Sequence, residues 1–204
     1  ALVLVAHLLS PASAWPLLYS VVLAAGGMLA YDFWYSRLGR GEAAVGEGEV
    51  FPTLPFLNAD GEPVFSDDWQ GQKTLILFYR GNWCPLCVAQ VKELAERYQN
   101  IADQGFRIVC ISPQSQAQTA SIAERFSVPM VFLSDPQAQA ADSLGIRHSA
   151  GVPAGMSGYD PDTVFPSIFV LNEQGRVLKA FLNDNYRDRP DPDSLVETLE
   201  RLSA

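Results

Sequence analysis

The sequence predicts an α/β fold in which helices flank a central mixed sheet, preceded by an N-terminal transmembrane helix. Three observations carry this prediction. Residues 1–31 contain no Asp, Glu, Lys or Arg. Apolar strand-like runs alternate with amphipathic helix-like segments over residues 74–144, and this order implies βαβ units with parallel strands. Two further apolar runs, at 167–171 and 176–181, are close enough to form an antiparallel hairpin.

Length and charge limit the organisation of the chain and its partners. Its 204 residues provide one domain of about 150 residues and an appendage. The formal net charge is −9 and the basic residues form no cluster, so no nucleic-acid partner is expected. Three cysteines cannot form a disulfide framework in a chain of this length, and two of them lie three positions apart. This spacing indicates redox or metal chemistry.

Residues 1–36 are predicted to be an apolar membrane anchor. A helix needs about 20 apolar residues to cross a bilayer core, and the uncharged run is long enough. Ser10-Pro11 interrupts it, so we expect one span from Trp15 to Tyr35, preceded by the end of another apolar helix over residues 1–9. Aromatic residues suited to the two membrane interfaces are Trp15, Tyr31, Trp34 and Tyr35.

A cleavable signal peptide is the alternative, because Ala12-Ser13-Ala14 resembles a small-residue cleavage site. Apolar sequence continues beyond this site and no basic segment precedes it, which favours a retained anchor. Arg37 and Arg40 favour a cytoplasmic domain, but two arginines leave the side of the membrane undetermined. Residues 37–49 are rich in Gly, Ala and Glu without apolar periodicity and are predicted to be a flexible linker.

The folded domain is predicted to cover residues 50–204. It begins with a hairpin of strands 51–58 and 62–65, joined by an Asp-Gly turn. The continuous apolar run at 74–79 is typical of a strand buried on both faces, hence of a central parallel strand. A helix is expected over 85–104, where apolar residues recur at helical spacing.

Strands and helices continue to alternate towards the end of the chain. The remaining expected elements are a strand at 107–112, a helix at 115–126, a strand at 130–134, a short helix at 137–144, an inserted loop at 149–163, a hairpin of strands 167–171 and 176–181, and a last helix from Asp191.

The chemistry-bearing motif is Cys84-Pro85-Leu86-Cys87. Two cysteines separated by two residues close a disulfide ring with little backbone movement, so the pair can cycle between dithiol and disulfide. The pair follows a buried strand and opens a helix, whose first N–H groups and dipole favour a thiolate. We therefore expect Cys84 to be the nucleophile and Cys87, one turn further, the resolving thiol. Pro85 fits the first helical turn, where its missing N–H costs little.

Metal binding and inert burial are the alternatives for this pair. Tetrahedral zinc would need two further ligands, and the domain offers only Cys110 and His148, neither at metal-ligand spacing. No metal and no other cofactor is therefore predicted. Cys110 lies within an apolar strand and is expected to be a small buried residue, and His148 to be solvated in a polar turn.

Residues 78–87 resemble the active-site signature of bacterial peroxiredoxin-like proteins of the AhpC/TSA (redoxin) family, within the thioredoxin superfamily. Residues 111–114, 165–170 and 184–189 are similar to later blocks of that family. The resemblance covers most of residues 50–204. It implies a thioredoxin-like fold and an antioxidant enzyme that acts on a hydroperoxide or on oxidised protein thiols, with a thiol reductant as partner. The first hairpin also resembles that of membrane-anchored TlpA-type thiol-disulfide oxidoreductases.

The resemblance also implies roles for single residues. Pro166 matches a superfamily proline that opens a strand in the cis form against the cysteines; a trans proline is the alternative. In typical peroxiredoxins the place of Cys84 belongs to a Thr and that of Cys87 to the peroxide-attacking cysteine, which would reverse the two roles. The arginine that polarises the peroxide in that family aligns with Pro166, so Arg80 and Arg189 are candidate substitutes.

The sequence thus predicts a membrane-anchored thiol-dependent oxidoreductase in which Trp83 walls the cysteine pair. Its oxidant is left open: the cysteine spacing and Pro166 favour protein disulfides, whereas the wider family blocks favour peroxide. The alternative from another class is a thioredoxin-fold copper-binding assembly factor without turnover, since soft thiolates suit Cu(I). Such factors usually space their cysteines by three residues, one more than in this chain.

Overall fold

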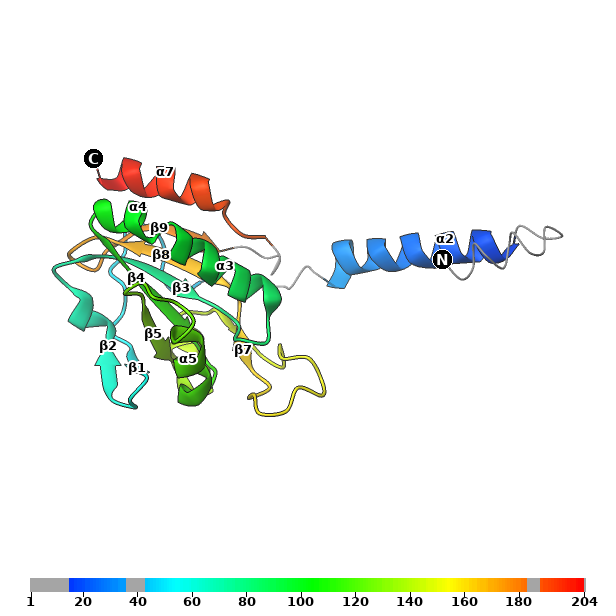
Figure 1. Ribbon diagram of the computed structural model, residues 1–204, viewed down its shortest axis with the longest axis horizontal. Coiled ribbons are helices and arrows are strands. Elements are labelled where there is room, and N and C mark those ends of the chain that lie inside the picture. The colour runs from blue at the N-terminus through cyan, green and yellow to red at the C-terminus, as the bar shows by residue number, and fades with distance from the viewer. Residues whose placement is uncertain (1–14, 36–42, 183–187, 204) are drawn as a thin grey trace. The chain divides into compact units, whose positions relative to one another are not determined.

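The computed structural model describes residues 15–35, 43–182 and 188–203, which belong to two separate compact units divided between residues 39 and 40 (Figure 1). The first unit contains the α-helix α2 (Trp15–Ala30), continued by the π-helical turn η1 (Tyr31–Tyr35). These bounds agree with the predicted span, whereas the helix expected over residues 1–9 lies outside the described residues.

The helix of the first unit is apolar and none of the α2 side chains is buried. Within the described part of the chain, Trp15–Phe33 is one helix long and apolar enough to cross a membrane. A signal sequence near an N-terminus meets the same criterion. The structure is therefore compatible with the predicted span.

The second unit is built around a seven-stranded mixed sheet with the strand order β2-β1-β5-β4-β3-β8-β9. Its strands are β1 (Pro55–Leu57), β2 (Pro63–Phe65), β3 (Lys73–Phe78), β4 (Phe106–Ser112), β5 (Val131–Ser134), β8 (Ser167–Leu171) and β9 (Val177–Leu182). A separate small sheet pairs β6 (Arg147–His148) with β7 (Thr163–Val164). The predicted mixed sheet is thereby confirmed.

The strand β3 lies inside the sheet, parallel to β4 and antiparallel to β8. Ile76 of β3 faces Val109 of β4 on one side and Phe169 of β8 on the other, and all three are fully buried. Because both faces of β3 are covered, its sequence shows a continuous apolar run instead of polar alternation. The carboxyl end of this strand leads directly into the cysteine motif.

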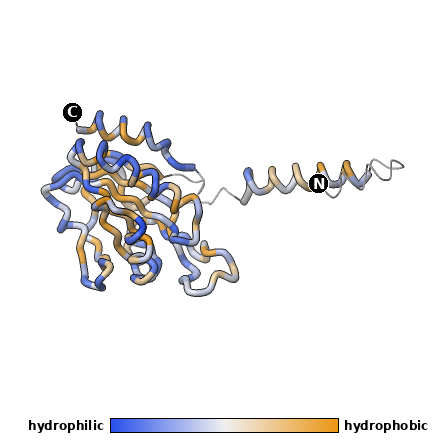
Figure 2. Tube along the Cα trace, in the orientation of Figure 1, coloured by the Kyte–Doolittle hydropathy of each residue, from blue (hydrophilic) through white to orange (hydrophobic). Residues whose placement is uncertain are grey.

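Helices cover both faces of this sheet. They are η2 (Ser66–Trp69), α3 (Pro85–Glu96), α4 (Tyr98–Asp103), α5 (Gln116–Ala123), η3 (Pro136–Ala138), α6 (Gln139–Ser143) and α7 (Pro192–Ser203). In Figure 1, α3, α4 and α7 gather on the same side of the sheet. Side chains alternate along a strand, so Leu75 and Leu77 pack towards α3, α4, α5 and α7, whereas Ile76 and Phe78 join the cluster of α6 and η2. Figure 2 shows the resulting apolar interior along the strands.

The predicted helix over 85–104 is divided in the structure into α3 and α4. Arg97 separates them with φ −101° and ψ 9°, outside the helical range. Its side chain forms an ion pair of 2.8 Å with Asp193 of α7, and beyond it α4 buries Ile101. The break between α3 and α4 therefore lies where α7 packs against them. The spacing of apolar residues along the sequence does not predict this tertiary contact.

The linker expected over residues 37–49 is shorter in the structure. Val45 is buried in the core, the Ala44 N–H donates to the carbonyl of Leu144 at 3.0 Å, and the Gly48 N–H donates to the carbonyl of Val177 at 2.8 Å. The described residues from 43 onward therefore pack on the folded unit. The sequence did not predict this packing, because the segment is poor in apolar residues and is held mostly by backbone hydrogen bonds.

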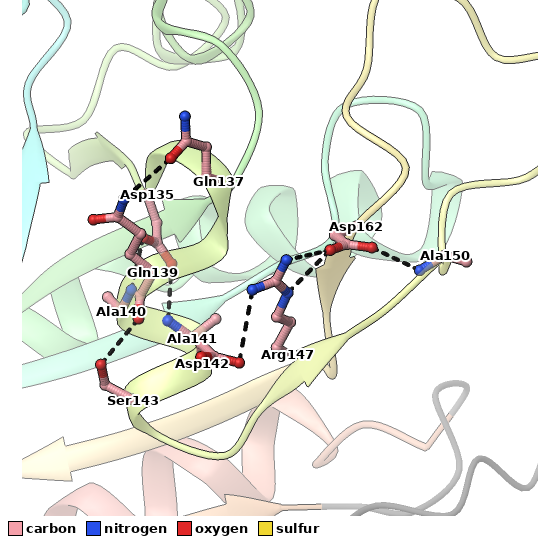
Figure 3. A network of polar contacts seen from close by, with 10 residues as sticks. All are labelled: Asp135, Gln137, Gln139, Ala140, Ala141, Asp142, Ser143, Arg147, Ala150 and Asp162. Carbon is pink, nitrogen blue, oxygen red and sulfur yellow. Dashed lines mark hydrogen bonds and ion pairs between the residues drawn. The ribbon is translucent and has the colours of Figure 1, made fainter.

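The loop predicted over residues 149–163 is held at its base by an ion pair between Arg147 and Asp162. Arg147 Nη2 lies 2.5 Å from Asp162 Oδ2, and Asp162 Oδ1 accepts the N–H of Ala150 at 2.8 Å (Figure 3). That backbone hydrogen bond and the guanidinium lower the pKa of Asp162. The two ends of the loop are thereby joined, and Tyr159 between them contacts Trp83 of the cysteine motif.

Candidate active site

The structure places both cysteines of the motif at the start of α3. Cys84 is the N-cap residue and Pro85 occupies the first turn, as predicted. The side-chain sulfurs of Cys84 and Cys87 lie 2.8 Å apart, with the Cys87 thiol donating a hydrogen bond to Cys84. A disulfide of about 2.0 Å is therefore reachable with a small movement of the two side chains. Cys84 is 4% exposed, whereas Cys87 is fully buried.

The pKa values of the two thiols are shifted in opposite directions. The hydrogen bond from the Cys87 thiol lowers the pKa of Cys84 to about 6, aided by the Cys87 backbone amide and the charges of Arg80 and Arg189, against the effect of burial. Burial raises the pKa of Cys87 well above its usual value, as does the neighbouring Cys84 thiolate. At neutral pH the site therefore holds a Cys84 thiolate beside a Cys87 thiol. This arrangement favours Cys84 as the nucleophile.

Arg80 is buried and its side chain holds the loop over residues 149–163 against the site. Its Nη2 donates to the carbonyl of Gly151 at 2.5 Å, and its guanidinium lies 4.7 Å from the ring centre of Trp83. The Arg80 carbonyl in turn accepts the hydroxyl of Thr163 at 2.8 Å. These contacts favour a structural role for Arg80, with its charge acting on Cys84 through space.

Arg189 brings its side chain into contact with a cysteine, whereas Arg80 reaches Cys87 through a backbone hydrogen bond. It precedes α7, and its Nη2 lies 3.9 Å from the Cys87 sulfur. Its charge lowers the pKa of both Cys84 and Cys87. Of the two arginines named as substitutes for the peroxide-polarising residue, Arg189 is thus the one beside the reacting atoms.

Gln114 organises the segment before the cysteines, a role that the sequence analysis missed. It is buried, and its amide nitrogen donates to the Tyr79 hydroxyl at 3.0 Å and to Asn82 Oδ1 at 3.1 Å. Its amide oxygen accepts the Asn82 N–H at 2.9 Å. Gln114 follows the carboxyl end of β4, next to β3, and residues at the ends of adjacent parallel strands meet at one edge of a sheet. The position of Gln114 just after a predicted strand could therefore have indicated its place beside the cysteine motif.

Gly81 allows the chain to turn from β3 towards α3. Its φ is +141°, in the region that favours glycine. A Cβ atom at this position would lie 2.8 Å from Trp83 Nε1 and 3.3 Å from Gln114 Oε1. Glycine is thus required by both the backbone conformation and the close approach of these two side chains.

Trp83 lies between the cysteine motif and the loop. Its ring packs with the apolar cluster that contains both cysteines, and the ring of Tyr159 meets it edge-on at 6.5 Å. Gln118 also contacts the loop, donating to the carbonyl of Gly158 at 2.9 Å. The predicted wall of the site therefore consists of Trp83 together with a loop residue that the sequence did not single out.

The expected cis conformation of Pro166 is wrong: among the described residues no peptide bond is cis. Pro166 lies between β7 and β8, and the preceding Phe165 N–H donates to the carbonyl of Ile146 at 2.7 Å. The chain thus passes extended from the small sheet into the large one, and a trans bond, the intrinsically preferred isomer, fits this path. Pro166 remains near the site, where it lines a small cavity with Arg189.

Cys110 and His148 do not join the cysteine pair. Cys110 is buried within β4, and burial raises its pKa to about 12, as expected for an inert thiol. His148 is half-buried and stacks on Phe165 with ring centres 4.8 Å apart, instead of lying in a solvated turn. Burial lowers the His148 pKa. No group of three potential metal-ligating side chains occurs among the described residues.

The fold and the paired cysteines define a thiol redox protein with a thioredoxin-like α/β domain. Residues 46–199 match the Redoxin family, and the chain belongs to this family. It is an enzyme of the thiol oxidoreductase and thiol peroxidase class. The apolar helix of the first unit lies outside the matched residues.

Individual proteins agree with this assignment. The chain is 25% identical over 155 residues to a putative peroxiredoxin bcp of Haemophilus influenzae, covering 76% of this chain and 96% of that one. The fold is similar to that of the peroxidoxin BcpB of Mycobacterium tuberculosis, with a TM-score of 0.62, 20% identity, and coverage of 76% and 97%. Peroxiredoxin 6 of Arenicola marina gives a TM-score of 0.67 at 13% identity, with coverage of 78% and 74%. The resemblance to TlpA-type proteins stays a prediction.

The acidity of Cys84 can be measured directly. Below pH 6 Cys84 is a neutral thiol and above it a thiolate, so its alkylation rate should rise with pH through a midpoint at about 6. In Cys87→Ala the donated hydrogen bond is lost, and the midpoint should move up towards the ordinary value of 9.0. Cys110→Ala is the matched control and should leave the midpoint in place. An unchanged midpoint in Cys87→Ala would contradict the assigned cause.

Proposed function

We propose that this protein is a membrane-anchored peroxidase that reduces hydroperoxides by cycling Cys84 and Cys87 between dithiol and disulfide. The observation that carries the proposal is the hydrogen-bonded pair, in which Cys84 has a pKa of about 6 and Cys87 remains a thiol. A thiolate at neutral pH is the nucleophile that peroxide reduction requires. The neighbouring thiol is in place for the next step.

The reaction proceeds in three balanced steps. The Cys84 thiolate attacks one peroxide oxygen, the O–O bond breaks, and the leaving alkoxide or hydroxide takes a proton from solvent to become alcohol or water. The sulfur of Cys87 then attacks the sulfenic acid of Cys84, the S–S bond forms, and the hydroxyl leaves as water with the proton of Cys87. Two thiols of a reductant finally exchange with the disulfide, so that Cys84 and Cys87 become thiols again and the reductant becomes a disulfide.

Access to the site favours a small oxidant over a protein disulfide. The 4% exposure of Cys84 leaves little room for a mixed disulfide with a folded protein, whereas a hydroperoxide is small. The support that Pro166 gave to protein disulfides depended on a cis form that the structure lacks. The relatives' names, putative peroxiredoxin bcp and Peroxiredoxin Bcp, point in the same direction.

A copper-binding function finds no support in the geometry. His148, the histidine that this alternative needed, stacks on Phe165 and forms no cluster with other ligand-type side chains among the described residues. Two buried sulfurs with one acidic thiol are accounted for by redox chemistry alone. Thiol peroxidase activity is therefore the function that the site supports best.

Thiol counting tests this function. The reduced full-length protein in detergent should lose two thiols per hydrogen peroxide consumed and gain a Cys84–Cys87 disulfide, detected by peptide mass spectrometry. The rate should exceed that of a free thiol by several orders of magnitude, while exchange with oxidised insulin remains slow. Cys110→Ser should behave like the wild type because Cys110 is inert. Slow reaction with peroxide and fast exchange with insulin would replace the proposal with protein-disulfide reduction.

The membrane anchor rests on the first unit. Trp15–Phe33 is long and apolar enough to span a bilayer, and large apolar side chains are exposed along it, including Leu23 at 73%. A helix with no buried face in its own unit needs an apolar environment around it. Lipid supplies that environment along the whole helix.

Cell fractionation tests the anchor. The full chain should stay in the membrane pellet after an alkaline wash. Replacing Leu23 by Arg should weaken its retention, since a charge at the centre of a span costs about 2.5–3.5 kcal/mol. Leu86→Arg in the folded domain is the matched control. Recovery of the wild type as a soluble chain shortened beyond residue 14 would support the signal-peptide alternative instead.

A further inference from the structure

We propose that Arg189 is a catalytic residue of the resolving step, in which its guanidinium stabilises the Cys87 thiolate as it attacks oxidised Cys84. This inference rests on the proposed peroxidase function and names a group that assists the attack of Cys87 on oxidised Cys84. The contact that carries it is the 3.9 Å approach of Arg189 Nη2 to the Cys87 sulfur.

The resolving step requires a negative charge on the buried Cys87 sulfur, which the resting site does not require. Before oxidation, the Cys87 thiol donates its hydrogen bond to the Cys84 thiolate and needs no charge of its own. After oxidation, Cys84 carries a hydroxyl, and Cys87 must become the nucleophile although it is fully buried. A buried thiolate is costly unless a positive group lies beside it.

Cys87 is shielded from solvent, since it is fully buried. A cavity that Arg189 lines together with Pro166 and Gln90 measures about 10 Å³, which is the space of about one water molecule. Gln90 lies one helical turn beyond Cys87 and its amide oxygen is buried without a hydrogen-bond partner among the described residues. Solvent therefore contributes little to stabilising the charge, which leaves the backbone hydrogen bond from Arg80 and the positive charge of Arg189.

Arg189 is better placed for this role than Arg80. The guanidinium of Arg80 is committed to the carbonyl of Gly151 and to the ring of Trp83. Arg189 Nη1 donates to the carbonyl of Asp188 at 2.9 Å, while Arg189 Nη2 approaches the Cys87 sulfur from the segment before α7. In the step itself, the Cys87 sulfur forms the S–S bond, the S–O bond of Cys84 breaks, and the hydroxyl leaves as water with the Cys87 proton.

Single-turnover kinetics of the full-length protein with hydrogen peroxide test the proposal. Sulfenic acid on Cys84 is trapped with dimedone, and the disulfide is quantified by mass spectrometry. In Arg189→Gln the sulfenic acid should form within about threefold of the wild-type rate and accumulate. The disulfide should form at least tenfold more slowly, because losing an opposite charge shifts a thiol pKa by about one unit or more.

Two further variants complete the test. Arg189→Lys keeps the charge and should restore most of the disulfide rate, whereas Arg125→Gln removes an exposed arginine outside the site and should change neither rate. Equal slowing of both steps in Arg189→Gln, no change in either, or failure of Arg189→Lys to restore the disulfide rate would overturn the role. A wild type unreactive towards peroxide would instead contradict the proposed function, so the two failures are distinguishable.

Discussion

The hydrogen bond between Cys87 and Cys84 at the start of α3 is the interaction on which the chemistry depends. It makes one sulfur a thiolate near neutral pH and keeps the other protonated, at a separation of 2.8 Å. The helix places both donors, the Cys87 thiol and its backbone amide, towards the N-cap position. Two identical side chains thereby take the two different roles that a dithiol cycle requires.

The rest of the domain fixes this pair in place. The buried strand β3 ends at the motif, and Gly81 turns the chain so that Gln114, which follows the neighbouring strand β4, can hold Asn82. The loop over residues 149–163 closes the other side, pinned by the Arg147–Asp162 ion pair and by Arg80. Each support comes from a different part of the sequence, which explains why one short motif needs a whole domain around it.

Much of this arrangement follows from local sequence. The apolar run of β3 and Pro85 after Cys84 predict a helix opening on a cysteine, and the structure confirms it. The contacts of Gln114 and Arg189 could not be predicted in this way because they join segments far apart in the chain. Local periodicity does not indicate which residues a loop side chain contacts. The cis expectation for Pro166 failed for the same reason: its neighbours in space, the strand pair β6 and β7, decide the path of the backbone.

The identity of the attacking sulfur is the central claim, since the register of typical peroxiredoxins would assign that role to Cys87. Single-turnover oxidation of Cys87→Ser and Cys84→Ser by hydrogen peroxide, with mass-spectrometric detection of sulfenic acid, separates the two assignments. The serine hydroxyl at position 87 can still donate a hydrogen bond, so Cys87→Ser should form sulfenic acid on Cys84 rapidly while Cys84→Ser reacts slowly. Rapid oxidation of Cys87 in Cys84→Ser, with a slow Cys87→Ser variant, would contradict the account.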